Sequence, residues 1–310
     1  MKFNKISSLA IAGIISFWNI NAQVNQDITV KIGGSYQKDT EYQKAIEKIN
    51  LDDAQLRVTY QFKYGVIKQK DISFITDTML LITGDNYSIY FDPNDIKRRD
   101  AFSSYVRQNG PPQVFMSSSQ SEFSELTINE NNYFSPSESG ETAQLYKDRE
   151  KNFITVMDFD NSNFGASELY FYQEESIHIP WEIKEDTISV LGYLCTKANC
   201  DFGGRIYTAW FTQDIPINEG PYKFYGLPGM ILKIEDSEKL FQFEAIGLEK
   251  LENAEIVIDE NSRYLKCTKE EYSTIKKRMR ENFTEFYREG MTLNYSYRKN
   301  GIEYIPIEKI

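Results

Sequence analysis

Two aspartates placed two positions apart, Asp158 and Asp160, are the residues of this 310-residue chain that best suit acid–base chemistry. If the run around them is a strand, both carboxylates lie on one face of it, roughly 7 Å apart. Carboxylates at such a separation can act as the general acid and general base of a hydrolase. The same spacing is common by chance, so an acid–base hydrolase is our alternative hypothesis and not our first.

Nucleophilic and metal chemistry is limited by the single histidine, His178. A Ser-His-Asp or Cys-His device would have to use this residue, and a zinc site with several histidine ligands is excluded. We therefore interpret His178 as a strand residue. The run that begins at Asp158 also resembles the start of a calcium loop, but Asn163 and Leu169 occupy the positions that need a glycine and a carboxylate. The sequence predicts no metal and no cofactor.

A group of aromatic and basic residues in and beside a loop with two prolines predicts a binding site instead. The group consists of Arg205, Trp210, Tyr222, Lys223 and Tyr225. Its rings could stack on a ligand while its cations hold an acidic group. In the alternative interpretation, Trp210 and Tyr222 pack in the core or at its rim, and Arg205 pairs with a local carboxylate. Our first hypothesis is a non-enzymatic protein that binds a ligand or a protein partner at this loop.

The motif Gly226-Leu227-Pro228-Gly229-Met230-Ile231 follows the same loop directly. Pro228 and Gly229 suit the two central positions of a type II turn, because proline presets φ and glycine accepts a positive φ. A tight turn that leads into a strand over residues 230–234 explains the motif without a ligand. A phosphate-binding loop is the alternative, but the Lys-Ser/Thr pair and the helix that such loops need are lacking.

Three cysteines, Cys195, Cys200 and Cys267, allow at most one intramolecular disulfide. A Cys195–Cys200 bond would close the end of a hairpin and is the pairing we favour. A Cys195–Cys267 bond, which would tie a helix to the sheet, stays open as the alternative. The leftover thiol is expected to be buried and inert.

Strand-like patterns dominate the elements that must position these residues. Residues 56–64 alternate between apolar and polar side chains, which is typical of a half-buried strand. Polar turn residues at 84–86, 147–152 and 236–239 separate further apolar runs and predict hairpins between antiparallel neighbours. The sequence predicts a mainly β fold, either a curved antiparallel sheet or an open barrel or sandwich, with a C-terminal amphipathic helix packed on it.

Helix signals are few, and the best covers residues 268–289. Thr268 and Glu271 form a capping-box pattern ahead of an apolar stripe, and Gly290 can end the helix. A weaker helix is predicted over residues 94–108. The polar stretch at 117–140 is expected to be an exposed loop or the join between two halves.

The first 22 residues have the pattern of a secretory signal peptide. Lys2 and Lys5 precede an apolar run that is too short to span a bilayer, and we expect cleavage after Ala22. Residues 23–310 then form a single β-rich domain without a transmembrane segment. With its first cysteine at Cys195, the chain is not expected to carry a lipid anchor. Its 35 Lys+Arg against 46 Asp+Glu, a net charge of −11, argue against nucleic acid as a partner.

The strongest pattern in the second half runs from Trp181 to Asp236. It includes Gly192-Tyr193-Leu194-Cys195, Thr208-Ala209-Trp210-Phe211-Thr212 and the Gly226–Ile231 motif. This run resembles the GLPGLI family of exported proteins of Gram-negative bacteria, with Met230 where that family usually has leucine. The resemblance implies a periplasmic or outer-membrane-associated β protein with no established activity. It also implies an outer-membrane receptor or another envelope protein as a partner, and a passive role in an outer-membrane assembly is a third hypothesis.

Overall fold

The computed structural model of the chain describes eight ranges: 29–32, 47–68, 71–97, 141–159, 169–259, 264–281, 291–294 and 304–309. The predicted signal peptide at 1–22 and the polar stretch at 117–140 lie outside these ranges.

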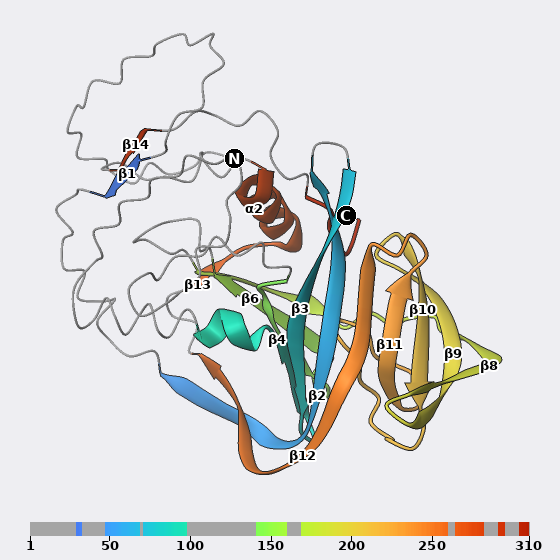
Figure 1. The fold of residues 1–310 in the computed structure, drawn as a ribbon. Helices are drawn as coiled ribbons and strands as arrows, with labels where there is room; N and C mark the ends of the chain where they lie inside the picture. Colours follow the sequence, from blue (N-terminus) through green and yellow to red (C-terminus); the bar gives the residue numbers. More distant parts are fainter. Residues whose placement is uncertain are drawn as a thin grey trace.

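An open sheet of 12 strands forms most of the described part (Figure 1). Its strands are β2 (Lys48–Lys68), β3 (Asp71–Thr83), β4 (Tyr87–Phe91), β5 (Gln144–Asp148), β6 (Phe153–Phe159), β7 (Leu169–Glu175), β8 (Glu182–Val190), β9 (Tyr193–Phe202), β10 (Arg205–Thr212), β11 (Met230–Asp236), β12 (Phe241–Asp259) and β13 (Tyr264–Lys266). The order across the sheet is β13-β7-β6-β5-β4-β3-β2-β12-β11-β10-β9-β8. All neighbours are antiparallel except β13 and β7. Two short strands, β1 (Thr29–Ile32) and β14 (Met291–Asn294), pair separately.

The alternation that predicted a strand at 56–64 is confirmed in β2. Tyr60 and Phe62 are buried whereas Gln61 between them is exposed. The predicted hairpins are also confirmed, since β3 pairs with β4, β5 with β6 and β11 with β12 across the three polar turns. Short connections keep successive strands adjacent, so the mainly β antiparallel prediction holds.

One continuous core shows that the sheet is curved. Leu81 of β3, Val156 of β6 and Phe211 of β10 belong to the same buried cluster, although many strands separate them in the sheet order. A flat sheet would keep these side chains far apart, because neighbouring strands are about 4.8 Å from each other. The concave face of the sheet therefore holds the main core.

A second, smaller core lies where the long β2–β12 ribbon bends back. The pairing of β12 with β2 shifts at three places, among them between Lys250 and Ala254, and such bulges bend and twist a strand pair. Beyond the bend, Ala54 and Ile256 pack with Met157 of β6. The outer face of the β5–β7 region is thereby covered by the ends of β2 and β12.

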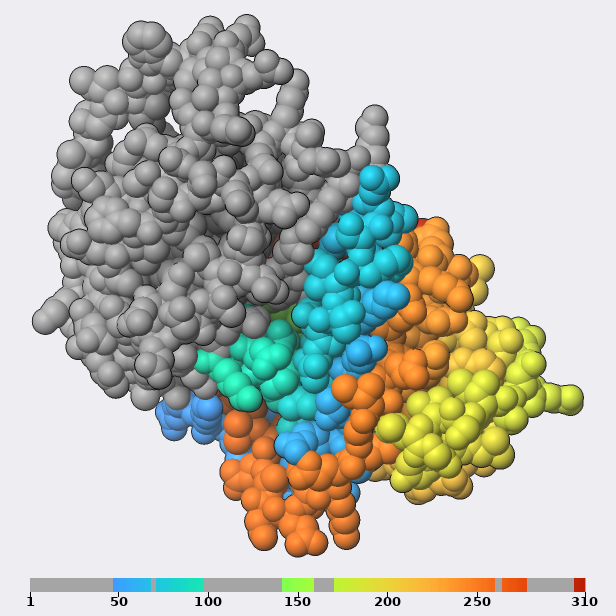
Figure 2. Space-filling model, viewed as in Figure 1, coloured from blue at the N-terminus to red at the C-terminus, as the bar shows by residue number. Residues whose placement is uncertain are grey.

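The edge strand β8 is irregular. Ile183 pairs with Ala198 and Thr187 pairs with Thr196, so the three β8 residues 184–186 lie opposite the single residue Lys197. Most of β8 is exposed. In Figure 2 this end of the sheet, coloured yellow, lies at the surface together with the orange strand β12.

Helix α2 (Lys269–Glu281) packs against β7 and confirms the predicted C-terminal helix as far as it is described. The capping box forms, because the Thr268 hydroxyl accepts from the Glu271 amide at 3.1 Å and the Glu271 carboxylate accepts from the Thr268 amide at 2.9 Å. Residues 282–289 of the prediction lie outside the described ranges. The weaker predicted helix is described over 93–97, where Asp92 caps its first turn. Among the described helices, none is both long and apolar enough to cross a membrane.

Candidate functional site

The five residues predicted to line one groove do not come together in one. Arg205 lies with its side chain buried in the concave face, where its guanidinium contacts Asp236 at 3.3 Å and Glu238 at 2.7 Å. Trp210 is half-buried on the convex face of β10, with the Lys197 ammonium 5.8 Å from its ring centre. The groove prediction is therefore wrong, and pairing of Arg205 with local carboxylates is the correct interpretation.

Tyr225 joins its loop to the segment that precedes β8. Its hydroxyl donates to the carbonyl of Ile177 at 2.6 Å, and its own carbonyl accepts from the Trp181 indole at 2.8 Å. His178 lies in this connecting segment and is exposed. The prediction that His178 is a strand residue is wrong, because Pro180 and the tyrosine contacts hold the chain outside the sheet here.

Lys223 and Tyr222 share a buried ionic cluster around Glu308. The Glu308 carboxylate accepts from Lys223 at 2.6 Å and from the Tyr222 hydroxyl at 2.7 Å through one oxygen. Its other oxygen accepts from Lys269 of α2 at 2.6 Å. Glu174 of β7 contacts both lysines. Two elements far apart in the sequence, the loop after β10 and the start of α2, thus converge on one carboxylate.

The electrostatics of this cluster favour the ionised form of Glu308. Burial by itself would raise the pKa of this carboxyl, but the charges and hydrogen bonds of Lys223 and Lys269 outweigh burial. The pKa of Glu308 falls from its ordinary value of 4.5 to about 2. The carboxylate is therefore charged throughout the physiological range.

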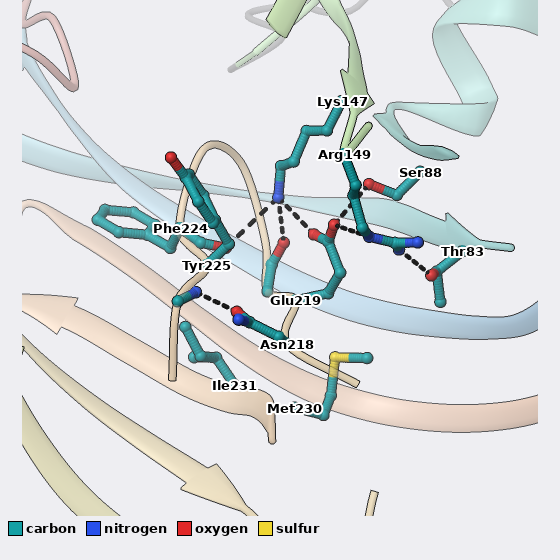
Figure 3. Close-up of polar contacts among 12 residues, drawn as sticks. Thr83, Ser88, Lys147, Arg149, Asn218, Glu219, Phe224, Tyr225, Met230 and Ile231 are labelled. Atoms are coloured by element: carbon teal, nitrogen blue, oxygen red, sulfur yellow. Dashed lines mark hydrogen bonds and ion pairs between the residues drawn. The ribbon is translucent and has the colours of Figure 1, made fainter. Parts of the chain in front are cut away.

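A second buried cluster surrounds Glu219, which lies in the same loop (Figure 3). The Glu219 carboxylate accepts from Lys147 at 2.7 Å, from Arg149 at 3.1 Å and from the Ser88 hydroxyl at 3.0 Å. Arg149 also donates to the Thr83 hydroxyl at 2.5 Å. Burial lowers the pKa of Lys147, while the neighbouring carboxylate opposes this effect. The cluster fastens the loop to the β3–β4 and β5–β6 hairpins.

The Gly226–Ile231 motif is a turn, but of a different type from the one predicted. The Gly229 amide donates to the Leu227 carbonyl at 2.8 Å, which closes a three-residue turn around Pro228. In a type II turn the Met230 amide would donate to the Leu227 carbonyl. Here that amide donates to the Ile215 carbonyl at 3.0 Å instead. Gly229 has a φ of 150°, and a Cβ there would overlap the carbonyl of Thr212. Glycine is needed at this position because the chain passes directly against β10.

The acidic pair predicted for catalysis is only half described. Asp160 lies outside the described ranges. Asp158 is 3% exposed on the concave face of β6, where it contacts Lys276 at 3.3 Å and accepts from the Tyr272 hydroxyl at 2.5 Å. Burial would lower the pKa of Lys276, but Asp158 and Glu141 outweigh it and raise that pKa. Asp158 thus serves to hold α2 on the sheet.

The favoured disulfide, Cys195–Cys200, does not form. Both cysteines lie on β9, five residues apart, which places their Cα atoms roughly 16 Å from each other. A disulfide needs a Cα separation below about 7 Å. Burial raises the pKa of Cys200 to about 12 and that of Cys267 to about 11, so these thiols are weakly nucleophilic.

An open pocket of about 140 Å³ lies between the bent end of the β2–β12 ribbon and the β6–β7 hairpin. Its apolar walls come from Ile49, Met157, Phe171 and Ile258. Three polar residues, Thr155, Gln173 and Asp259, also line it, and we call them its polar rim. The Gln173 amide donates to the Thr155 hydroxyl at 3.1 Å, which fixes the orientation of both rim groups. In the part of the chain that the structure describes, no group of His, Cys, Asp and Glu is arranged to hold a metal ion.

Sequence reasoning missed the residues that organise these clusters. Lys147 lies two positions after the buried Leu145 on the same strand, so both side chains lie on the same face of the sheet. Lys276 lies four positions after Tyr272, on the apolar stripe of α2. Both spacings would have placed a lysine in the core. Glu219 and Glu308 carry no such signal, because each lies outside a regular element.

Comparison with known proteins gives a short family match. Residues 204–233 match the family described as "Protein of unknown function (Porph_ging)". None of the curated proteins that were compared matches the sequence. The described fold is similar to "Structure of PNGF-II in P21 space group", at 14% identity and a TM-score of 0.46 over 74% of this chain and 34% of that chain. The C2 form of PNGF-II gives 15% identity and a TM-score of 0.45, with the same coverage. The chain thus spans about a third of the length of these structures.

Proposed function

We propose that this chain is an exported, non-enzymatic protein that binds a small apolar ligand in the pocket between β2, β12, β6 and β7. The observation that carries the proposal is the pocket itself, with apolar walls and a polar rim. A cavity of about 150 Å³ lined by aliphatic and aromatic side chains can hold one benzene molecule. The ligand class is therefore a single aromatic ring or a short branched alkyl group.

The rim defines the rest of the ligand. Thr155 engages one of the two N–H groups of the Gln173 amide, and the carbonyl oxygen of that amide is able to accept a hydrogen bond from a ligand. Asp259 at the same rim favours a neutral or cationic head over an anion. A phenol or a single-ring aromatic amine satisfies both conditions.

Catalysis is less well supported than binding. Asp158, the described member of the predicted acidic pair, faces the core and contacts Lys276 and Tyr272. A general acid or base must reach its substrate within hydrogen-bond distance. The hydrolase hypothesis would need α2 to leave the sheet, which exposes a buried lysine at the same time.

Export rests on the signal-peptide pattern of residues 1–22 and on the resemblance of residues 181–236 to the GLPGLI family. We propose the periplasm or the outer membrane as the location of the protein, and an outer-membrane receptor or another envelope protein as its partner. Mass spectrometry of the protein purified from the envelope tests this. A chain that starts at Gln23 supports export, and a chain that retains Met1 in the cytoplasmic fraction refutes it.

Ligand-observed NMR with p-cresol and toluene tests the pocket. We expect both probes to bind with a Kd of about 1 mM or tighter. Ile49→Trp should abolish binding, since Ile49 lines the pocket, is 47% exposed and would be replaced by a larger side chain that fills the opening. Ile246→Trp is the matched control, because Ile246 is 51% exposed on β12 away from the pocket.

The polar rim is tested by Gln173→Ala. Loss of one hydrogen bond, worth about 1 kcal/mol, should weaken the binding of p-cresol about fivefold and leave the binding of toluene unchanged. Equal binding to the Ile49→Trp and Ile246→Trp proteins, or no binding of either probe to the unmodified protein, would overturn the proposal. In the latter case a passive role in an assembly becomes the better hypothesis.

A further inference from the structure

Two carboxylates and one amine meet in the interior between helix α2 and strand β6. Lys276 of α2 contacts Asp158 of β6 at 3.3 Å and also contacts Glu141, which precedes β5. All three residues are buried, with exposures of 4% for Lys276, 3% for Asp158 and 8% for Glu141. Bulk water is therefore excluded from the atoms that meet here.

A tyrosine hydroxyl holds the amine and one carboxyl group together. Tyr272, one helical turn before Lys276, donates to the Asp158 carboxylate at 2.5 Å and accepts from the Lys276 ammonium at 2.9 Å. The Lys276 nitrogen lies 3.3 Å from Oδ2 of Asp158, so the carboxyl carbon, one bond further, is at most about 4.5 Å away. Because reacting atoms meet at about 3–3.5 Å, a shift of about 1 Å in the lysine side chain is sufficient for attack.

The other buried lysines of the described ranges have contacts of a different kind. Lys147 has one carboxylate among its described contacts, that of Glu219. A lone carboxylate cannot both take the proton of an amine and be attacked by it. Lys223 shares its carboxylates with Lys269, and against burial these two charges lower the pKa of Glu308 to about 2. A carboxyl group that is held in its ionised form is a poor target for an amine.

Condensation of the amine with a carboxyl group would remove charge from the interior. Burial favours the uncharged form of Lys276, although Asp158 and Glu141 outweigh burial and raise its pKa, so the resting group is an ammonium. A buried ion pair carries the desolvation cost of both ions, whereas an amide is uncharged. Two groups fixed in contact also react as if each were present at a concentration on the order of 10⁵ M or more. Burial and proximity thus both favour an amide over the ion pair.

We infer that Lys276 and Asp158 form an intramolecular isopeptide bond, with Glu141 as the group that transfers the proton. Glu141 takes a proton from the Lys276 ammonium, and the freed amine attacks Cγ of Asp158, whose carboxyl group is polarised by the Tyr272 hydroxyl. The new N–Cγ bond replaces one Cγ–O bond, and the departing oxygen receives one proton from Glu141 and one from the nitrogen. An ammonium and a carboxylate thus become an amide and one water molecule, without an oxidant or a co-reactant. Helix α2 is then tied covalently to β6.

Mass spectrometry of the folded, purified protein, denatured only for the measurement, tests the inference. We expect a mass about 18 Da below that of the linear sequence, because one water is lost. Cyclisation of an N-terminal Gln23 would remove about 17 Da and a disulfide about 2 Da, so neither is mistaken for the amide. Since trypsin does not cleave after a modified lysine, digestion should yield a branched peptide that joins residues 152–184 to residues 270–277.

Four variants separate the amide from other losses of water. Lys276→Arg keeps the positive charge but removes the amine, so this variant should have the full mass of its sequence. Asp158→Asn should lose ammonia in place of water and give a product of the same mass as the cross-linked unmodified protein. Glu141→Gln removes the proton acceptor and should slow the reaction by about 100-fold or more. Lys277→Arg changes the exposed neighbouring lysine of α2 and is the matched control that should still lose one water.

Two results would overturn the inference. The first is a folded protein that has the full mass of its sequence both when freshly purified and after overnight incubation, which would leave this site as an ion pair. The second is a loss of water that persists in Lys276→Arg, because its source would then be another dehydration, such as a succinimide. Where Lys276→Arg fails to fold, the branched peptide of the unmodified protein decides the same question, since its fragments identify both linked residues.

Discussion

Replacement of Glu219 by glutamine should destabilise the protein more than any surface substitution. The Glu219 side chain is 2% exposed and the Lys147 side chain 5% exposed, so the substitution leaves a buried ammonium without the carboxylate that it contacts at 2.7 Å. Removing one partner of a buried ion pair costs about 3–5 kcal/mol. That is a large part of the roughly 5–15 kcal/mol that stabilises a typical domain.

The double variant distinguishes an interacting pair from two independent residues. Lys147→Met should cost a similar amount, because it also removes the donor to the carbonyls of Gly220 at 3.2 Å and Phe224 at 3.4 Å. The double variant should be less unstable than the sum of the single variants by about 1–3 kcal/mol. Urea unfolding followed by circular dichroism measures the free energy of unfolding of the two single variants and the double variant. The comparison holds if the dependence of this free energy on urea concentration is the same in all of them.

An exposed ion pair supplies the control. Lys233 and Glu244 contact each other at 2.8 Å on the convex face, with side chains 28% and 51% exposed. Breaking this pair by Glu244→Gln should cost less than about 1 kcal/mol. If Glu219→Gln costs no more than Glu244→Gln, or if the two cluster substitutions simply add, the cluster does not act as a buried pair and our reasoning about the loop fails.

Three further substitutions test other parts of the structure. Because the folded-state pKa of Glu308 lies below the unfolded one, its stabilisation is complete above about pH 5 and declines as the pH falls towards about 2. Over this pH range the free energy of unfolding, measured with urea, should therefore fall by up to about 3 kcal/mol more in the unmodified protein than in the Glu308→Gln variant. Equal losses in the two proteins would contradict the assigned ion pairs. Gly229→Ala should destabilise by at least about 2 kcal/mol through its clash with Thr212, whereas an unchanged melting temperature would show that the turn relaxes freely. Thr268→Ala should cost about 1 kcal/mol by removing the cap of α2, and a loss no larger than that of exposed Lys266→Ala would refute the cap.

Local patterns in the sequence predicted the elements that form the sheet. Alternation in β2 reports burial on one face, and polar turns report short antiparallel connections, because both effects act between residues close in sequence. The capping box of α2 is equally local, because the side chains of Thr268 and Glu271 each accept a hydrogen bond from the backbone amide of the other residue. These predictions were confirmed for that reason.

The clusters around Glu219 and Glu308 could not be predicted in the same way. Lys147 and Glu219 are 72 positions apart, and Lys223 and Glu308 are 85 positions apart. Which lysine meets which carboxylate depends on the curvature of the sheet, and no short motif encodes that. The same limit explains why Arg205 and Tyr222 were assigned to a ligand although internal partners bind them.

The mismatch in β8 has a consequence for contacts between molecules at this edge of the sheet. An open sheet exposes an edge that can pair with the edge of another molecule and seed fibrils. Here the three unmatched residues, Lys184, Glu185 and Asp186, interrupt the ladder and place three charges at the point where a foreign strand would have to align. A strand of another molecule that paired with β8 would lose regular hydrogen bonds and bury those charges. This edge therefore disfavours pairing between molecules, although the sheet is open.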